Sequence, residues 1–326
     1  MKDYLLMTLL LFLIMVVSPL VTLIDKADNA EPTATISTAA GKTERTEESS
    51  SHETVTLMVS STGKLTEMSA EEYLYGAVCA EMPASFHKEA LKAQAVASYT
   101  YMKWLKENAD NPSQIKADIT DNPEIHQAYI SDEELQKRWG SSYDIYSEKV
   151  KEAVKSVLYE YLAYEKKTAM TVFHGISPGK TVSAQAAWGN EIPYLSSVTA
   201  PGDKLSPDIT TELSISKEDF VKHFDGAKAE NTEEILKGIK TSDEGYVNEI
   251  TYKKQKLSSA DLRSAYNLKS PFLKIESNKS NVLFTVYGKG HGVGMSQYSA
   301  DYMARQGSTY DEILAHFYKG TELKTQ

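Results

Sequence analysis

The stretch from residue 69 to residue 107 constrains the fold most, because it encodes two helices separated by a proline. Ser69 followed three positions later by Glu72 has the form of a capping box, which predicts that a helix begins directly afterwards. Pro83 cannot continue that helix, since its ring removes a backbone donor and pushes the preceding residue out of the helical region. The pattern therefore predicts a rigid unit of helix, break and helix.

Glu81 stands at the predicted break. Ser85 can cap the second helix, which we expect to run from about residue 86 to residue 107. A carboxylate on a corner between two helices can point into a cleft. The alternative is an ordinary solvated residue at a helix end, since exposed glutamates are far commoner than catalytic ones.

The N-terminal segment indicates whether the protein is held in a membrane. Residues 4–24 are almost wholly apolar, and at about 1.5 Å per residue such a helix can cross a hydrocarbon layer of about 30 Å. A cleaved signal peptide is the alternative, but its apolar region is usually only about 7–15 residues long. We expect an uncleaved transmembrane anchor at residues 1–26. Residues 27–53 are rich in Thr, Ser, Glu and Ala, which predicts a disordered linker.

Residues 54–326 are long enough to bury a sizeable core, and helix and strand patterns are mixed along them, so we expect an α+β domain. The net charge of −10 argues against nucleic acid as a partner. Cys79 is the single cysteine, which excludes an intramolecular disulfide. Twenty tyrosines and three tryptophans could stack on sugars, although most such rings serve in ordinary packing.

A glycine-rich loop at residues 288–294 contains His291. No Gly-Lys-Ser/Thr follows it, so a phosphate-binding P-loop is not expected. No HExxH or equivalent spacing is present in the sequence, and we expect neither a catalytic metal nor another cofactor.

Three segments, in order along the chain, resemble the stage II sporulation protein D family. They are EEYLYGAVCAEMPASFHKEALKAQAVASYTY at 71–101, FHGISPGKTVSAQAAWGNEIPYLSSVTAPGD at 173–203 and GKGHGVGMSQYSADYMARQG at 288–307. The resemblance implies a membrane-anchored lytic transglycosylase that cuts peptidoglycan during engulfment in endospore formers. It also implies a two-lobed domain with a glycan-binding cleft. The related amidase enhancer proteins supply an alternative, a non-catalytic peptidoglycan-binding modulator of a wall amidase.

The resemblance also implies which residues form the site. Glu81, in the Glu-Met-Pro turn, is the implied catalytic acid. The implied substrate contacts are Lys92, Tyr99, His174, Ser177, Lys180, Trp188, His291, Ser296 and Gln297. For Trp188 the alternative is a core tryptophan, and for His291 a structural histidine. We expect Glu81, Trp188 and His291 to approach one another in the fold.

One departure from the family pattern affects the interpretation. Tyr99 stands where the family usually has an arginine, and tyrosine cannot supply a fixed charge. Its presence favours the modulator, whereas the presence of Glu81 favours the enzyme. Pro178, where a second small residue is usual, is a smaller departure.

The resemblance further implies the reaction and its setting. The enzyme would cleave denuded strands between N-acetylmuramic acid and N-acetylglucosamine and leave a 1,6-anhydro end. The domain would lie on the extracytoplasmic side of the septal or engulfing membrane, held there by the N-terminal helix. A sporulation amidase and other septal membrane proteins are the implied protein partners.

Overall fold

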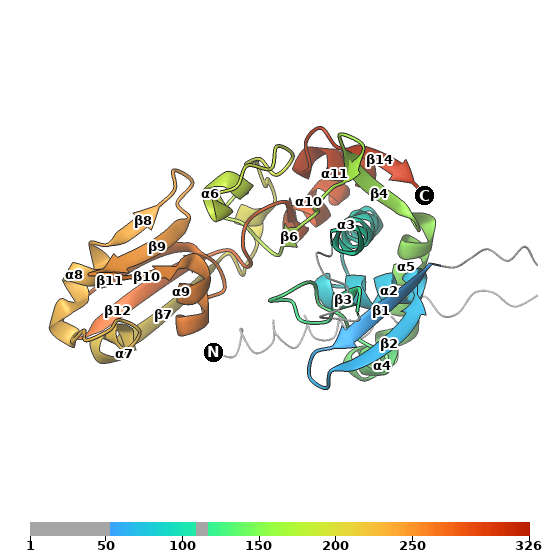
Figure 1. The fold of residues 1–326 in the computed structure, drawn as a ribbon. Coiled ribbons are helices and arrows are strands. Elements are labelled where there is room, and N and C mark those ends of the chain that lie inside the picture. The colour runs from blue at the N-terminus through green and yellow to red at the C-terminus, as the bar shows by residue number, and fades with distance from the viewer. Residues whose placement is uncertain (1–52, 109–116) are drawn as a thin grey trace, which may run out of the picture. The chain divides into compact units, whose positions relative to one another are not determined.

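The computed structural model describes residues 53–108 and 117–326 (Figure 1). The expected anchor at residues 1–26 and almost all of the expected linker at residues 27–53 lie outside these ranges. Inside them, no helix is both long enough and apolar enough to cross a membrane.

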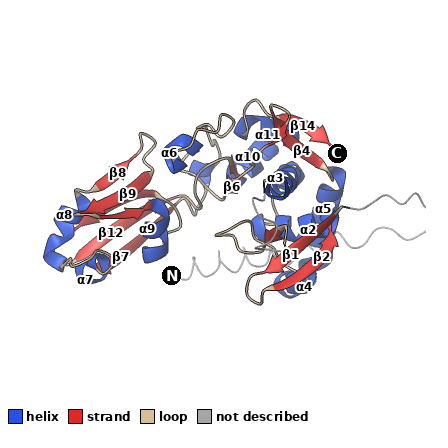
Figure 2. Cartoon of the chain, in the orientation of Figure 1, coloured by secondary structure: helices blue, strands red, loops and turns tan. Residues whose placement is uncertain are grey.

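The described chain is a mixed α+β domain with several small sheets, which confirms the expected class (Figure 2). The α-helices are α2 (Ala70–Glu81), α3 (Lys88–Glu107), α4 (Asp132–Trp139), α5 (Tyr143–Ser156), α6 (Ala184–Trp188), α7 (Lys217–Val221), α8 (Thr232–Leu236), α9 (Ser259–Tyr266), α10 (Gln297–Arg305) and α11 (Tyr310–Phe317). Short 3₁₀ helices are η2 (Gly140–Ser142), η3 (Asp203–Leu205) and η4 (Ala229–Asn231).

The strands form five sheets of two or three strands each. They are β1 (Thr54–Val59), β2 (Lys64–Ser69), β3 (Ile119–Thr120), β4 (Glu160–Tyr164), β5 (Lys167–Thr168), β6 (Phe173–His174), β7 (Thr210–Ser216), β8 (Ile239–Thr241), β9 (Val247–Tyr252), β10 (Gln255–Ser258), β11 (Phe272–Ser277), β12 (Asn281–Tyr287), β13 (Met295–Ser296) and β14 (Glu322–Thr325). The strand orders are β2-β1-β3, β14-β4-β5, β13-β6, β11-β12-β7 and β10-β9-β8.

The predicted helix pair is present, and Ser69 caps its first helix as expected, although only the Ser69 half of the capping box is formed. The side chain of Ser69 accepts a hydrogen bond from the backbone N–H of Glu72, and α2 ends at Glu81. The second cap differs from the prediction. Phe86 N–H donates to the Pro83 carbonyl, so the turn extends past Ser85, and α3 is capped instead by the side chain of His87.

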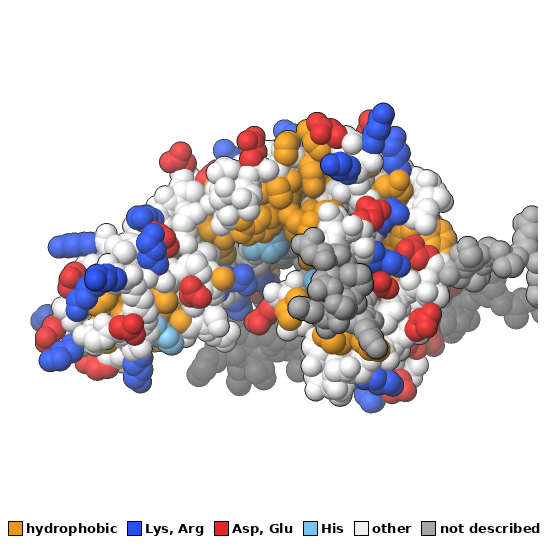
Figure 3. Space-filling view, viewed as in Figure 1, with side chains coloured by type: hydrophobic (Ala, Val, Ile, Leu, Met, Phe, Trp, Pro, Cys, Tyr) orange, Lys and Arg blue, Asp and Glu red, His pale blue; other side chains and the backbone are white. Residues whose placement is uncertain are grey.

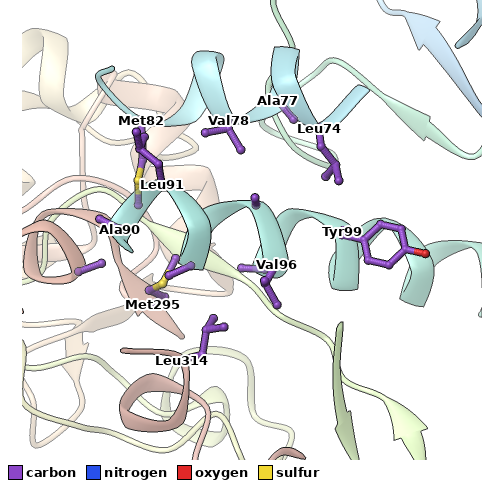
Figure 4. Close-up of a cluster of buried hydrophobic side chains, with 14 of the residues drawn as sticks. Leu74, Ala77, Val78, Met82, Ala90, Leu91, Val96, Tyr99, Met295 and Leu314 are labelled. Atoms are coloured by element: carbon purple, nitrogen blue, oxygen red, sulfur yellow. The ribbon is translucent and has the colours of Figure 1, made fainter. Parts of the chain in front are cut away.

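The larger hydrophobic core surrounds α3, which packs against α2, α5, α10, α11 and β4 (Figure 1). Figure 4 shows Leu91 of α3 facing Val78 of α2 and Met82, which follows α2, on one side, with Met295 and Leu314 on the other. All five side chains are buried. A fully buried Leu, Val or Met contributes about 1.5–3 kcal/mol, so this packing fixes the corner on which Glu81 lies.

A second hydrophobic core lies among residues 210–286. Its centre is aromatic, since the ring of Tyr266 lies 5.6 Å from that of Phe220 and 5.0 Å from that of Phe284, measured between centroids. The sheet β11-β12-β7 supplies one part of this core, and β12 leads directly into the glycine-rich loop. The two-lobed arrangement with a cleft stays a prediction.

The described part of the excursion between α3 and α5 packs on α2. The ring of Tyr129 stacks on that of Tyr73 with 6.1 Å between centroids. Gly76 of α2 lets Tyr129 approach, because a Cβ built at Gly76 would lie 2.3 Å from that ring. Ala128, which precedes Tyr129, therefore lies close enough to the end of α2 for its backbone N–H to bond to Glu81.

Candidate active site

Glu81 is held by two hydrogen-bond donors from distant parts of the chain. Its Oε1 accepts from the backbone N–H of Ala128 at 2.8 Å, and its Oε2 accepts from Nε2 of Gln297 at 3.3 Å. The side chain is partly buried at the carboxyl end of α2. Both bonds and the packing of α2 fix the direction of the carboxyl group.

Burial is the largest influence on Glu81 and raises the pKa of its carboxyl group above the ordinary value of 4.5. The position at a helix carboxyl end acts in the same direction, because the helix dipole disfavours negative charge there. Hydrogen bonds from Ala128 and Gln297 and the charge of Lys289 oppose the shift. Glu81 thus has the property that a general acid needs, a proton held more firmly than in water.

Gln297 is itself fixed by α3. Its Nε2 lies 3.3 Å from Oε1 of Gln94, and Nε2 of Gln94 donates to Oγ of Ser98 at 3.1 Å. All three side chains are buried. The chain of amides therefore connects Glu81 to the central helix of the core, and Gln94 is a member that sequence reasoning missed. Its only local signal was a polar pair at spacing i and i+4 in an apolar helix face.

His174 and His291 are oriented by the backbone of one residue, Val293. Nδ1 of His174 donates to the Val293 carbonyl at 3.0 Å, and Nδ1 of His291 accepts from the Val293 N–H at 3.1 Å. Burial lowers the pKa of His174 to about 4 and that of His291 to about 3, so both rings are neutral near pH 7. Nε2 of His174 is buried and has no hydrogen-bond partner among the described residues.

Trp188 lies beside His291, with 5.7 Å between ring centroids. It ends α6 and remains 40% exposed, which excludes the alternative of a core tryptophan. The expected approach of Trp188 and His291 is confirmed. No described hydrogen bond of Glu81 goes to either residue, so the expectation that all three meet is confirmed only for this pair.

Asp203 connects the second and third sequence segments. Its fully buried carboxyl group accepts from the backbone N–H and Oγ of Ser177 at 2.5 and 2.7 Å, and from Oγ of Ser296 and Ser299 at 2.7 and 2.8 Å. Burial raises its pKa, and the four bonds act against that shift. Because the hydroxyls of Ser177 and Ser296 are buried and already bonded, their placement supports a structural role and not the expected glycan contact.

Comparisons with known proteins show the family to which this chain belongs. Residues 59–164 match the family described as Stage II sporulation protein. Stage II sporulation protein D of Bacillus subtilis strain 168 is 35% identical over 253 residues, which are 78% of this chain and 74% of that protein. The chain belongs to the stage II sporulation protein D family. The protein of the same name from Bacillus amyloliquefaciens is also 35% identical, over 78% of this chain and 73% of its own length.

A more distant relative of this family member is the amidase enhancer of Bacillus subtilis strain 168. It is 25% identical over an alignment of 306 positions that covers 77% of this chain and 40% of that protein. The expected resemblance to the family is thus confirmed, together with the distant link to amidase enhancers.

Two further candidates, Lys92 and Tyr99, form their described polar contacts with residues other than Glu81. Lys92 pairs with Glu89 at 2.8 Å, and its ammonium lies 5.4 Å from the ring centroid of Tyr310. Tyr99 is fully buried, and its hydroxyl donates to Oε2 of Glu53 at 2.6 Å. Both lie on one side of α3, seven residues apart, whereas Gln94 faces the opposite side toward Gln297 and Glu81.

The remaining candidate, Lys180, is exposed and bridges through its backbone to Thr199. Within residues 53–108 and 117–326, no group of three His, Cys, Asp or Glu side chains is arranged to hold a metal ion. In the view of Figure 3, charged side chains of both signs are dispersed, and hydrophobic ones gather over the region of β6, α10 and α11.

Proposed function

We propose that this member of the stage II sporulation protein D family is a lytic transglycosylase acting on peptidoglycan glycan strands during engulfment. The observation that carries the proposal is the environment of Glu81. It combines burial, which favours the protonated acid, with two donors that can stabilise the carboxylate formed after proton transfer. A group that must give and then retrieve a proton needs both influences.

The reaction requires a single carboxyl group. Glycosidases that use water generally place two carboxyl groups about 5–10 Å apart. Among the described residues, the buried carboxyl groups other than Glu81 are those of Asp203 and Asp301. Asp203 is bonded to three serines, and Asp301 accepts from the His87 N–H and from Arg305, so both are occupied inside the protein. This supports chemistry in which Glu81 performs both proton transfers.

The steps balance without water. Protonated Glu81 donates to the oxygen that joins C1 of N-acetylmuramic acid to N-acetylglucosamine, and the bond from C1 to that oxygen breaks. The 6-hydroxyl oxygen of the same muramic acid forms a new bond to C1, and its proton passes to the Glu81 carboxylate. The products are a 1,6-anhydro end and a free 4-hydroxyl, and Glu81 is again protonated.

Trp188 and His291 are the proposed platform for a sugar ring. The indole is 40% exposed, and the adjoining imidazole is neutral, so both faces are suitable for stacking against the apolar face of a pyranose. The ring of His174 lies 5.9 Å from that of His291, measured between centroids, and its Nε2 is a buried acceptor that a hydroxyl or water could satisfy.

The alternative function is a non-catalytic modulator of a wall amidase, and the 25% identity to an amidase enhancer favours it. The argument from Tyr99 carries less weight than the sequence suggested. Tyr99 is buried and bonded to Glu53, so replacing the family arginine there leaves the hydrogen bonds of Glu81 unchanged.

We further propose that residues 1–26 anchor the protein in the septal or engulfing membrane, with the domain on the extracytoplasmic side. An amidase that strips stem peptides would then supply its substrate. N-terminal sequencing of the membrane fraction tests the anchor. We expect a chain beginning at or near Met1, and a soluble form beginning near Ala30 would contradict it.

Analysis of the products tests the proposed activity. The purified domain is incubated with peptide-free glycan strands, and the masses of the fragments are measured by mass spectrometry. We expect muramic acid ends one water lighter than the ends that hydrolysis leaves. Binding of strands without any product would support the modulator instead.

A further inference from the structure

Lys289 is an exposed lysine on a fixed backbone. Its N–H donates to the Ile176 carbonyl at 2.7 Å, and its own carbonyl accepts from the Ile176 N–H at 3.0 Å. Gly290, which follows it, has a φ of +98°, and a Cβ there would lie 2.8 Å from Cβ of His174. The loop after β12 is therefore pressed against the second family segment, and the position of residue 289 is well defined.

The stem of Lys289 crosses Gly175. A Cβ built on Gly175 would lie 3.4 Å from both Cβ and Cδ of Lys289, so the glycine gives the lysine stem a flat surface to lie on. The Gly175 carbonyl accepts from Tyr298 N–H at 3.1 Å, and the residue before Tyr298 is Gln297, which donates to Glu81. The lysine thus lies over the segment that holds the acid.

The ammonium of Lys289 has no carboxylate within ion-pair distance among residues 53–108 and 117–326, although twelve ion pairs occur there. The positive charge of Lys289 nevertheless acts on Glu81 and lowers the pKa of its carboxyl group. An exposed cation on a fixed backbone, whose charge reaches the acid and which has no ion-pair partner among the described residues, is available to an anionic group of the substrate.

We propose that Lys289 binds the free lactyl carboxylate of the muramic acid whose C1 reacts, and so selects strands that lack stem peptides. This inference rests on the proposed function of Glu81. The lactyl ether is attached to C3 of that sugar, within one ring of the reacting carbon. A stem peptide converts this carboxylate to an amide, which removes the charge that Lys289 recognises.

Binding measurements in the Glu81→Gln background test the proposal without turnover. Three strands serve as probes: peptide-free strands, peptide-free strands with their carboxyl groups converted to methylamides, and peptide-bearing strands. We expect Lys289→Gln to weaken binding of the peptide-free strands by about two- to fivefold, the upper part of the range of an exposed ion pair, and to leave binding of the methylamide strands unchanged. Lys289→Arg should retain the preference for the first.

The matched control is Lys279→Gln. Lys279 is also exposed, loses the same charge, and lies in the turn before β12, at the opposite end of that strand from Lys289. The Lys279→Gln variant should bind all three kinds of strand as the Glu81→Gln parent does. Equal binding of free and amidated strands by the parent would overturn the proposal, as would an equal loss in Lys279→Gln. A loss confined to peptide-bearing strands would also overturn it, since Lys289 would then contact the peptide.

A second readout uses the active enzyme. Removing the Lys289 charge should raise the pKa of Glu81, so Lys289→Gln should keep its activity to higher pH even while its KM for peptide-free strands rises. An unchanged pH profile would contradict the placement of the ammonium beside Glu81. If the wild type forms no anhydro product, the proposed function fails, whereas the binding comparison still decides the role of Lys289.

Discussion

Nε2 of Gln297 lies 3.3 Å from Oε2 of Glu81, although 216 positions separate the two residues in the sequence. Gln297 is the first residue of α10, and Glu81 is the last of α2. The bond therefore brings the third family segment to the acid of the first. It also makes the protonation of Glu81 depend on a side chain that belongs to another element.

Gln297→Leu should raise the pKa of Glu81, because a donor to the carboxylate stabilises its charged form. Activity requires the protonated acid, so the decline of kcat/KM at high pH should move to higher pH. The other groups that lower the pKa of Glu81 are the backbone N–H of Ala128 and the charge of Lys289, and neither is altered. A pH–rate profile measures the shift. Gln306→Leu, at the exposed end of the same helix, is the control and should leave the profile in place.

Glu81→Gln should stabilise the fold at neutral pH. The folded-state pKa of Glu81 lies above its ordinary value of 4.5, so the stability that it contributes is fully present below about pH 4.5 and is lost as the pH rises through the folded pKa. Urea denaturation should thus show a gain over wild type near neutral pH and no gain in acid. Glu71→Gln, exposed in the first turn of α2, should show no such dependence, and a matching gain there would refute the assignment to Glu81.

Asp203→Ala should destabilise the domain by at least about 3 kcal/mol. It leaves three buried donors, the N–H and hydroxyl of Ser177 and the hydroxyl of Ser299, without an acceptor, and each such group costs about 1–3 kcal/mol. The hydroxyl of Ser296 keeps the Gly175 carbonyl as a second acceptor. Chemical denaturation measures the loss. Asp208→Ala, a neighbouring exposed aspartate, should change the free energy of unfolding by less than about 0.5 kcal/mol. Similar losses in the two variants would argue against the structural role of Asp203.

Tyr99→Phe should cost about 0.5–1.5 kcal/mol of stability, the net worth of the hydrogen bond to Glu53, and should leave glycan cleavage unchanged. The sequence favoured a substrate contact at this position, and its burial supports a structural one. Denaturation and product yield are measured on the same preparation. A fall in cleavage with no change in stability would restore the substrate contact.

Local chemistry made part of this architecture predictable. The capping pair of Ser69 and the break at Pro83 place Glu81 at a helix end, and both depend only on neighbouring residues. The cap of α3 was missed, because the turn after Pro83 is closed by a backbone bond that side-chain preferences do not reveal. His87 caps instead of Ser85 for that reason.

The partners of the acid were harder to predict than the acid itself. Gln297 was expected near the substrate from the family resemblance, but its bond to Glu81 depends on how α10 packs on α3. Ala128 contributes only its backbone N–H, which carries no signal in the residue type. Gln94 and Asp203 are buried polar groups whose donors and acceptors lie far along the chain, and only the fold reveals that they are satisfied.

The most direct test of the account compares wild type, Glu81→Gln and Glu71→Gln in their release of 1,6-anhydro ends from peptide-free glycan, with water enriched in ¹⁸O. The account predicts anhydro product without ¹⁸O from wild type and Glu71→Gln. It predicts a fall of about 10²–10⁴-fold in Glu81→Gln, the range of lost acid–base catalysis, while binding persists. Equal product from wild type and Glu81→Gln, or ¹⁸O in the new ends, would contradict the assignment of Glu81 as the acid and base of a transglycosylase.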